Sequence, residues 1–270
     1  MKKLSKIYLG IILMFLYVPI FVLIVFSFNT TKSRTVMSGF TLEWYEKLFH
    51  NEIIMSSLLN TIIIAVLASI AATILGTAAA IGINSMKKLP KVLILNITNF
   101  PIINPEIVTG VSLMLLFVFF AARMNVEFGF ATLLIAHITF DVPYVILNVM
   151  PKFRQMDPFL YEAAQDLGCS PVKAFFKVVL PEIMPGVVSG FLMSFTFSLD
   201  DFIISYFTSG SSTQTLPVTI YSMTRRKVSP EINALSTIIF VIVVIVLIVK
   251  NVAERRIENK ENPAVRRRNK

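Results

Sequence analysis

Several hydrophobic runs of this chain are each long enough to cross a lipid bilayer, and no other feature limits its fold as strongly. About 20 helical residues, rising about 1.5 Å each, span a hydrocarbon core of about 30 Å. We expect such spans at residues 7–28, 58–83, 102–122, 128–150, 182–208 and 232–249. The sequence therefore predicts an all-α membrane protein, with six transmembrane helices in one domain over residues 1–250 and a basic cytoplasmic tail over residues 251–270.

Composition and charge support this class. Hydrophobic residues make up 55% of the chain and charged residues only 15%, against about 25% in soluble domains. The net charge of +9 could indicate nucleic-acid binding, but the basic residues gather beside the spans, so we expect no nucleic-acid partner. Their distribution places both termini in the cytoplasm under the positive-inside rule. One basic triplet, Arg225 to Lys227, falls on an expected outer loop, where it is either solvated or folded over the mouth of a pathway.

The sequence offers little for redox, metal or nucleotide chemistry. Cys169 is the single cysteine and there are two histidines, too few for a disulfide framework or a metal site of usual spacing. No phosphate-binding loop of the form GxxxxGK[ST] occurs. We therefore expect no cofactor, no bound metal and no catalytic residue.

The longest polar break on the expected cytoplasmic side runs from Asp157 to Pro181. Asp157 before a proline is a helix start, Gly168 is a helix stop, and Ser170 before a proline is a second start. Two short helices are expected, each with one apolar stripe: Leu160, Ala163, Ala164 and Leu167, then Val172, Phe175, Phe176 and Val179. Such a pair of amphipathic helices needs a partner that covers it.

This stretch resembles the EAA loop of bacterial ABC-importer permeases. The matching positions are Glu162, Ala163, Ala164, Gly168, Leu180 and Pro181, with Val178 where the family usually has isoleucine. The resemblance implies the type I ABC-importer permease fold. It also implies that residues 157–181 form a coupling helix that docks into a groove of a cytoplasmic ATPase.

Four carboxylates lie within or at the edge of the expected spans: Glu106, Asp141, Asp200 and Asp201. A carboxylate at the bilayer centre costs about 2.5–3.5 kcal/mol, so such groups usually face a cavity or a partner. Asp201 continues a helical stripe of three serines, Ser194, Ser198 and Ser205, and is expected to face the lumen. Asp200 lies about 100° around the helix from Asp201, so its alternative is a bond to a facing span or subunit. The alternative for each acid is a structural hydrogen bond, and Glu106 has a further one as a helix N-terminal charge after Pro105.

Aromatic side chains accompany these acids in the sequence: Phe140, Tyr144, Phe195 and Tyr206. Ring faces attract ammonium groups and cover methylenes, so carboxylates and rings together suit a linear polyamine. The runs SFTFSLDDFIISYFTSG and AHITFDVPYV are similar to the C-type permease subunit of spermidine/putrescine importers. We therefore predict a substrate path that includes Asp201, Asp200, Asp141, Glu106, Tyr144 and Tyr206.

The resemblance implies a transport subunit of the bacterial inner (cytoplasmic) membrane that encloses half of a translocation path. Its implied partners are a second permease in a heterodimer, two copies of a cytoplasmic ABC ATPase, an extracytoplasmic polyamine-binding protein and the lipid bilayer. One alternative is the same machinery carrying another solute, such as an amino acid, a sugar or another cation. A second is an intramembrane aspartyl protease built on Asp141 and Asp201.

Overall fold

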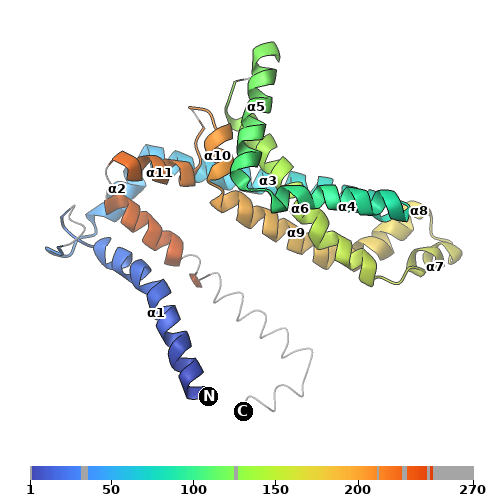
Figure 1. The fold of residues 1–270 in the computed structure, drawn as a ribbon, viewed down its shortest axis with the longest axis horizontal. Helices are drawn as coiled ribbons and strands as arrows, with labels where there is room; N and C mark the ends of the chain where they lie inside the picture. Colours follow the sequence, from blue (N-terminus) through green and yellow to red (C-terminus); the bar gives the residue numbers. More distant parts are fainter. Residues whose placement is uncertain are drawn as a thin grey trace. The chain divides into compact units, whose positions relative to one another are not determined.

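The computed structural model describes residues 2–31, 36–124, 127–211, 213–226, 230–241 and 244–245. Within these ranges the regular structure is helical (Figure 1), and the β pairing is one isolated bridge between Asn29 and Phe40. The chain divides into two compact units, residues 1–55 with 222–270, and residues 56–221. In the described part of the chain, five helices are long and apolar enough to cross a membrane. The chain is thus an all-helical membrane protein.

The first unit contains α1 (Lys2–Phe26) and α2 (Glu43–His50). From Ile7 to Phe26 α1 is apolar on every side and none of its side chains is buried, which suits a helix surrounded by lipid or by a partner. The short helix expected near Trp44 is present as α2. Trp44 itself is buried and its indole N–H donates to the carbonyl of Asn29 at 2.6 Å, which ties α2 to the chain after α1.

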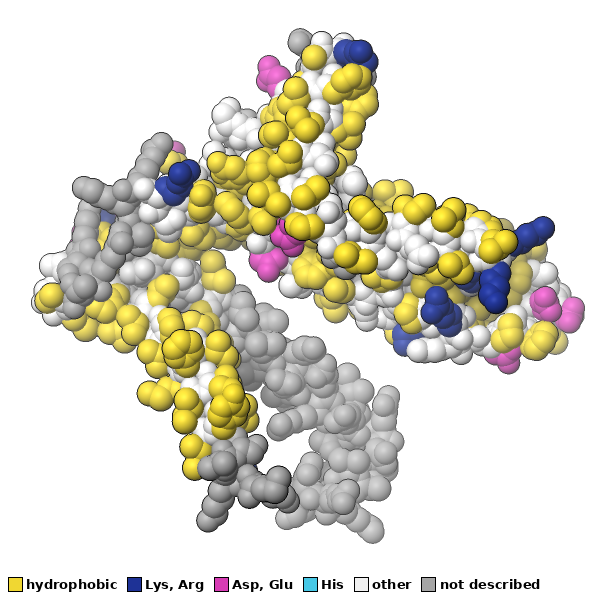
Figure 2. All heavy atoms as spheres, in the orientation of Figure 1, with side chains coloured by type: hydrophobic (Ala, Val, Ile, Leu, Met, Phe, Trp, Pro, Cys, Tyr) yellow, Lys and Arg dark blue, Asp and Glu magenta, His cyan; other side chains and the backbone are white. Residues whose placement is uncertain are grey.

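The second unit holds most of the remaining elements. They are α3 (Glu52–Asn84), α4 (Lys88–Ile103), α5 (Glu106–Met124), α6 (Phe130–Gln155), α7 (Leu160–Asp166), α8 (Pro171–Ala174), η1 (Phe175–Val179), α9 (Leu180–Asp200), α10 (Ile203–Thr208) and α11 (Leu216–Arg226). Among these, α3, α5, α6 and the continuous run from Pro171 to Asp200 are long enough to span a bilayer. Basic side chains gather at the end of this unit that holds α7 and α8 (Figure 2).

The third predicted span begins at a different residue from the one expected. α4 continues to Ile103, and a new helix, α5, starts at Glu106. Pro105 lacks the amide proton that would continue α4 and disfavours helical backbone at Asn104, which is extended. The predicted start at residue 102 was therefore wrong, and Ile102 belongs to the end of α4.

The fifth predicted span, residues 182–208, was wrong at both ends. The helix starts at Pro171 and passes through a π-helical turn, η1, into α9, so Leu180 and Pro181 lie inside it. It then stops at Asp200, and a separate short helix follows. A π-turn alters the local hydrogen-bond pattern of a helix and is frequent at functional sites.

The sixth predicted span is described only in its first part. A shorter apolar helix covers Pro230–Val241, and residues 242–243 and 246–249 lie outside the described residues. The predicted tail over residues 251–270 and Lys227 of the basic triplet also lie outside them.

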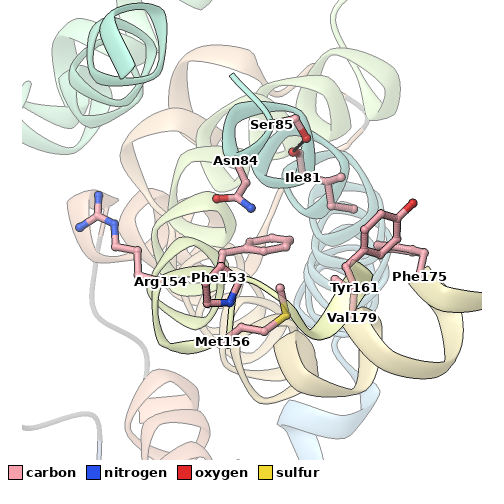
Figure 3. Close-up of a pocket in the computed structure, with 10 residues that line it drawn as sticks. Ile81, Asn84, Ser85, Phe153, Arg154, Met156, Tyr161, Phe175 and Val179 are labelled. Atoms are coloured by element: carbon pink, nitrogen blue, oxygen red, sulfur yellow. Dashed lines mark hydrogen bonds between the residues drawn. The ribbon is translucent and has the colours of Figure 1, made fainter. Parts of the chain in front are cut away.

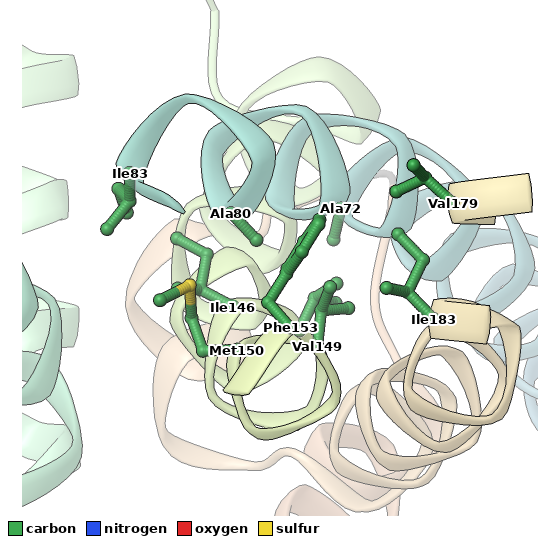
Figure 4. Close-up of a cluster of buried hydrophobic side chains, with 10 residues drawn as sticks. Ala72, Ala80, Ile83, Ile146, Val149, Met150, Phe153, Val179 and Ile183 are labelled. Carbon is green, nitrogen blue, oxygen red and sulfur yellow. The ribbon is translucent and has the colours of Figure 1, made fainter. Parts of the chain in front are cut away.

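The core of the second unit lies where α6 packs against α9, with α3 beside them (Figure 4). Glycines allow this close approach, because a Cβ on Gly186 would lie 2.7 Å from the carbonyl oxygen of Asn148. Likewise, a Cβ on Gly190 would lie 3.1 Å from the Cα of Val145. The contacts between the two helices therefore repeat every four residues, which is about one helical turn.

Candidate functional site

A helix break lies between α9 and α10, and we call residues Asp200, Asp201 and Phe202 the acidic break. Asp201 has an extended backbone, with φ −60° and ψ 124°. Its carboxylate accepts hydrogen bonds from the backbone amides of Ile204 at 3.2 Å and Ser205 at 2.7 Å. These amides belong to the first turn of α10, where they lack helical partners. Asp201 thus ends one helix and starts the next.

His137 of α6 joins the two sides of the break, and it was not among the residues selected from the sequence. Its Nδ1 lies 2.6 Å from the hydroxyl of Ser198, and its Nε2 lies 3.0 Å from the hydroxyl of Ser205. Nε2 is also 3.6 Å from a carboxylate oxygen of Asp201. A sequence signal existed, since His137 lies one helical turn before Asp141 inside an apolar span.

Asp141 is enclosed in the α6–α9 interface. The pairs Val149–Gly186 and Val145–Gly190 are in contact, and from this register we expect Asp141 to face Ser194 one turn further along. Asp141 is 0% exposed. Within the described part of the chain, no hydrogen-bond partner reaches either carboxylate oxygen of Asp141 or the hydroxyl of Ser194. In this conformation Asp141 has no access to solvent.

Glu106 and Asp200 are the exposed acids of the predicted set. Glu106 begins α5, which packs on α10: a Cβ on Gly110 would lie 3.0 Å from the ring of Phe207. Both Asp200 and Asp201 lie within electrostatic range of Glu106. Acidic side chains gather at the foot of α5 in Figure 2. The two exposed carboxylates therefore share one patch of the surface.

The two predicted tyrosines belong to different aromatic clusters. Tyr206 of α10 is 46% exposed and packs beside Phe202 and Tyr221, with ring centroids 5.6 and 6.0 Å away. Tyr144 is half-buried on α6 and packs against Phe140 and Phe197, with centroids 5.2 and 4.5 Å away. The cluster around Tyr206 directly follows Asp200 in the chain, and Tyr144 lies within electrostatic range of Glu106, so ring faces occur near both exposed carboxylates.

The stretch from residue 157 to 181, which we call the coupling loop, contains α7 and the start of the long helix. α7 ends in the hydrogen-bond pattern of a Schellman motif, because Cys169 donates to the carbonyl of Ala164 at 3.1 Å and Gly168 to that of Gln165 at 2.8 Å. Gly168 has φ +87°, a backbone conformation that favours glycine. Of the EAA positions, Glu162 and Ala163 are exposed and Ala164 is buried.

Two features of this loop differ from the expectation. α7 starts at Leu160 and not directly after Asp157, because the Asp157 carboxylate accepts the amide proton of Phe159 at 2.9 Å and holds a turn there. The second expected short helix is instead the first part of the helix that runs to Asp200. Large apolar side chains on the loop are exposed: Phe159, Leu167, Val172 and Phe176.

A pocket of about 560 Å³ lies behind the coupling loop (Figure 3). Its walls come from the end of α3, the end of α6, α7 and the π-turn. Asn84, Phe153 and Tyr161 are among its lining residues. Val179 of the π-turn also belongs to the buried core, and Tyr161 and Phe175 pack against it, so the loop borders both the hollow and the core.

No group of three or more potential metal-ligating side chains occurs among the described residues. The polar groups of the site are instead carboxylates, hydroxyls, one imidazole and aromatic rings. Such groups suit reversible binding of a cation, through charge and ring faces.

Comparisons with known proteins place the chain in a family. Residues 72–260 match the model of the family described as "Binding-protein-dependent transport system inner membrane component". The chain is 39% identical over 236 residues to the putrescine transport system permease protein PotI of Escherichia coli (strain K12), covering 83% of this chain and 81% of that protein. It is 36% identical over 249 residues to the spermidine/putrescine transport system permease protein PotC of Haemophilus influenzae, covering 92% and 95%.

Solved structures show the same fold. A chain of a bacterial ABC transporter involved in the import of the acidic polysaccharide alginate superposes with a TM-score of 0.68 at 15% identity, covering 94% of this chain and 95% of that one. A chain of an amino acid ABC transporter crystallised with histidines gives a TM-score of 0.54 at 21% identity, covering 80% and 99%. The fold is therefore that of ABC-importer permeases.

The family consists of transport components, so the aspartyl-protease interpretation is wrong and the resemblance drawn from the sequence is confirmed. The extent of the family match, the identity to the two permeases and the shared fold agree with one another. This multi-pass helical chain belongs to the family of binding-protein-dependent transport system inner membrane components.

Proposed function

We propose that this chain is a six-span permease subunit of a type I ABC importer that moves polyamines, putrescine or spermidine, into the cell. The observation that carries the substrate class is the pair of exposed carboxylates, Glu106 and Asp200, in one patch beside the aromatic cluster of Phe202, Tyr206 and Tyr221. The names of the similar PotI and PotC permeases support the same class.

The chemistry of a polyamine fits this patch. Its ammonium groups are separated by short methylene chains, so a carboxylate meets each charge and ring faces cover the methylenes. We place Glu106, Asp200 and Tyr206 on the substrate path in the present conformation. Asp141, Asp201 and Tyr144 would join it only in a conformation that opens the α6 side, because here they are buried or half-buried.

The conformational change driven by ATP hydrolysis would reach this chain through the coupling loop. Its exposed apolar side chains, with Glu162 and Ala163 also exposed, suit docking to a cytoplasmic ATPase, present in two copies. The helix from Pro171 to Asp200 has 30 residues, about 45 Å at 1.5 Å per residue, and joins this loop to the acidic break. Movement of the loop would therefore be carried to the carboxylates by one helix.

The other proposed parts follow the family. A second, different permease would complete the path, an extracytoplasmic binding protein would deliver the polyamine, and both termini would lie in the cytoplasm. Rigid-body rocking would expose the acidic patch to each side in turn.

The test is uptake by the complete complex in proteoliposomes. ATP is supplied on the side of the membrane that carries the ATPase, and the labelled solute on the opposite side. Labelled putrescine and spermidine are offered beside a neutral sugar and a zwitterionic amino acid. We expect ATP-dependent accumulation of putrescine, spermidine or both, and no accumulation of the sugar or the amino acid. Accumulation of the sugar or amino acid without a polyamine would overturn the substrate class and leave the importer intact.

A further inference from the structure

We infer that His137 is a positioning residue for the polyamine site, because it bridges α9 and α10 and so fixes the spacing of the two exposed carboxylates. We call His137 and its contacts Ser198, Ser205 and Asp201 the His137 bridge. This inference rests on the proposed function for its substrate, although the bridge can be tested without it.

The bridge joins elements that no helix hydrogen bond holds together. Ser198 lies in the last turn of α9, and Ser205 lies in the first turns of α10. The imidazole reaches both hydroxyls, at 2.6 and 3.0 Å, from a helix that runs beside them. All of these side chains are buried. With the backbone extended at Asp201, the break would otherwise be a natural hinge.

The neutral imidazole has the right donors and acceptors for this position. One ring nitrogen donates and the other accepts. We assign the proton to Nε2, because this nitrogen faces both the Ser205 hydroxyl and, at 3.6 Å, the Asp201 carboxylate, which favours an N–H on that side. Nδ1 then accepts the hydroxyl proton of Ser198. In this tautomer every member of the bridge is paired.

The bridge determines the spacing of the carboxylates through α10. Asp200 is the last residue of α9, two positions after Ser198. α10 packs on α5, where a Cβ on Gly110 would lie 3.5 Å from the carbonyl of Ile203, and α5 begins with Glu106. The His137 bridge therefore links the helix that carries Asp200 to the helix that carries Glu106. A polyamine with fixed charge separation depends on that distance.

The experiment compares His137→Phe and His137→Gln in the complete transport complex. Phenylalanine fills the same space without hydrogen bonds, and glutamine keeps an amide donor near the position of Nε2. The matched control is Ser69→Ala, since Ser69 is also buried and, among the described residues, its hydroxyl donates only to the carbonyl of Val66 in its own helix.

We expect H137F to raise the KM for polyamine uptake about tenfold at nearly unchanged maximal rate and unchanged assembly, because two buried hydrogen bonds are lost. H137Q should recover part of the affinity, and S69A should match the unaltered complex. An unchanged KM in H137F, or a lower maximal rate at unchanged KM, would overturn the inference. If H137F does not assemble, Ser205→Ala removes the α10 half of the bridge and should raise KM by a smaller factor.

Amide hydrogen exchange tests the His137 bridge without relying on the identity of the substrate. In H137F the amides of residues 203–208 should exchange at least several-fold faster than in the unaltered complex, and in S69A they should not. If the complex carries no polyamine, the proposed function fails while this comparison still decides whether the bridge holds the break. Equal exchange in H137F and the unaltered complex would show that it does not.

Discussion

The coupling loop and the acidic break lie at the two ends of one long helix, and they are stabilised in different ways. The turns of the loop are formed by contacts between near neighbours: the Gly168 turn, and a hydrogen bond from the amide of Lys173 to the side chain of Ser170. The break is held by His137, which is 61 residues from Ser198 and 68 from Ser205. The loop is therefore readable from a short stretch of sequence, whereas the break depends on the packing of α6.

The two ends also differ in what covers them. On the loop, Leu167 is 88% exposed and Phe176 is 60% exposed. At the break, Ser198 and Ser205 are buried and paired, and only Asp200 and Tyr206 are exposed. The loop therefore exposes large apolar side chains, whereas the region of the break buries its serines and exposes one carboxylate and one ring.

Replacing Asp200 by Asn should have the largest effect on transport and tests the break as a ligand site. A hydrogen bond to a charged group contributes about 1.5–3 kcal/mol, so KM for polyamine uptake should rise roughly 10- to 100-fold. Uptake kinetics with purified complex measure this. The control is Glu46→Gln on α2, which removes one exposed acid outside both the patch and the coupling loop. Equal KM values in D200N and the unaltered complex would remove Asp200 from the path.

Replacing Gly186 by Ala tests the helix from Pro171 to Asp200, which joins the coupling loop to the acidic break. The new methyl would meet the Asn148 carbonyl at 2.7 Å, and overpacking of this kind costs about 1–3 kcal/mol. We expect a clearly lower midpoint of thermal unfolding in detergent. Gly82→Ala is the matched control, because nothing lies within 4 Å of its added Cβ. If both variants unfold at the same temperature, the close α6–α9 contact does not limit stability.

Replacing Gly168 by Ala tests the loop as a docking element. A non-glycine residue in left-handed backbone costs about 1–2 kcal/mol, which should distort the turn after α7. We expect about tenfold slower uptake with an unaltered KM for the polyamine, together with weaker stimulation of the ATPase. Measuring ATP hydrolysis and uptake on the same preparation separates docking from substrate binding. A raised KM with normal coupling would contradict the division of roles between loop and break.

Replacing Asp141 by Asn should have the smallest effect and distinguishes the two possible roles of this acid. Asp141 is 0% exposed, so in the present conformation a neutral isostere removes no ligand contact. We expect a KM within about twofold and an unchanged or higher unfolding temperature, since a buried carboxylate without a hydrogen-bond partner is costly. A rise in KM like that of D200N would show that Asp141 joins the path in another conformation.

The helix ends show where prediction from sequence succeeds and where it fails. Gly168 and the Ser170–Pro171 start were recognisable, because caps act on residues three or four positions away. The end of the long helix at Asp200 was not, since Ser194, Ser198, Asp201 and Ser205 have the spacing of an unbroken helix. The break follows when Asp201 uses its carboxylate on the amides of α10 while His137 holds both sides.

The sequence by itself determined the class of the molecule and the glycine turn at Gly168, and it predicted which acids lie within or beside the spans. These follow from local properties: the length of apolar runs, the spacing of capping residues and the cost of a charge in lipid. Only the tertiary structure decided which acids are exposed and which are enclosed. The exposure of each acid depends on the side chains that another helix brings opposite it. The packing of α6 on α9 encloses Asp141 and brings His137 to Ser198.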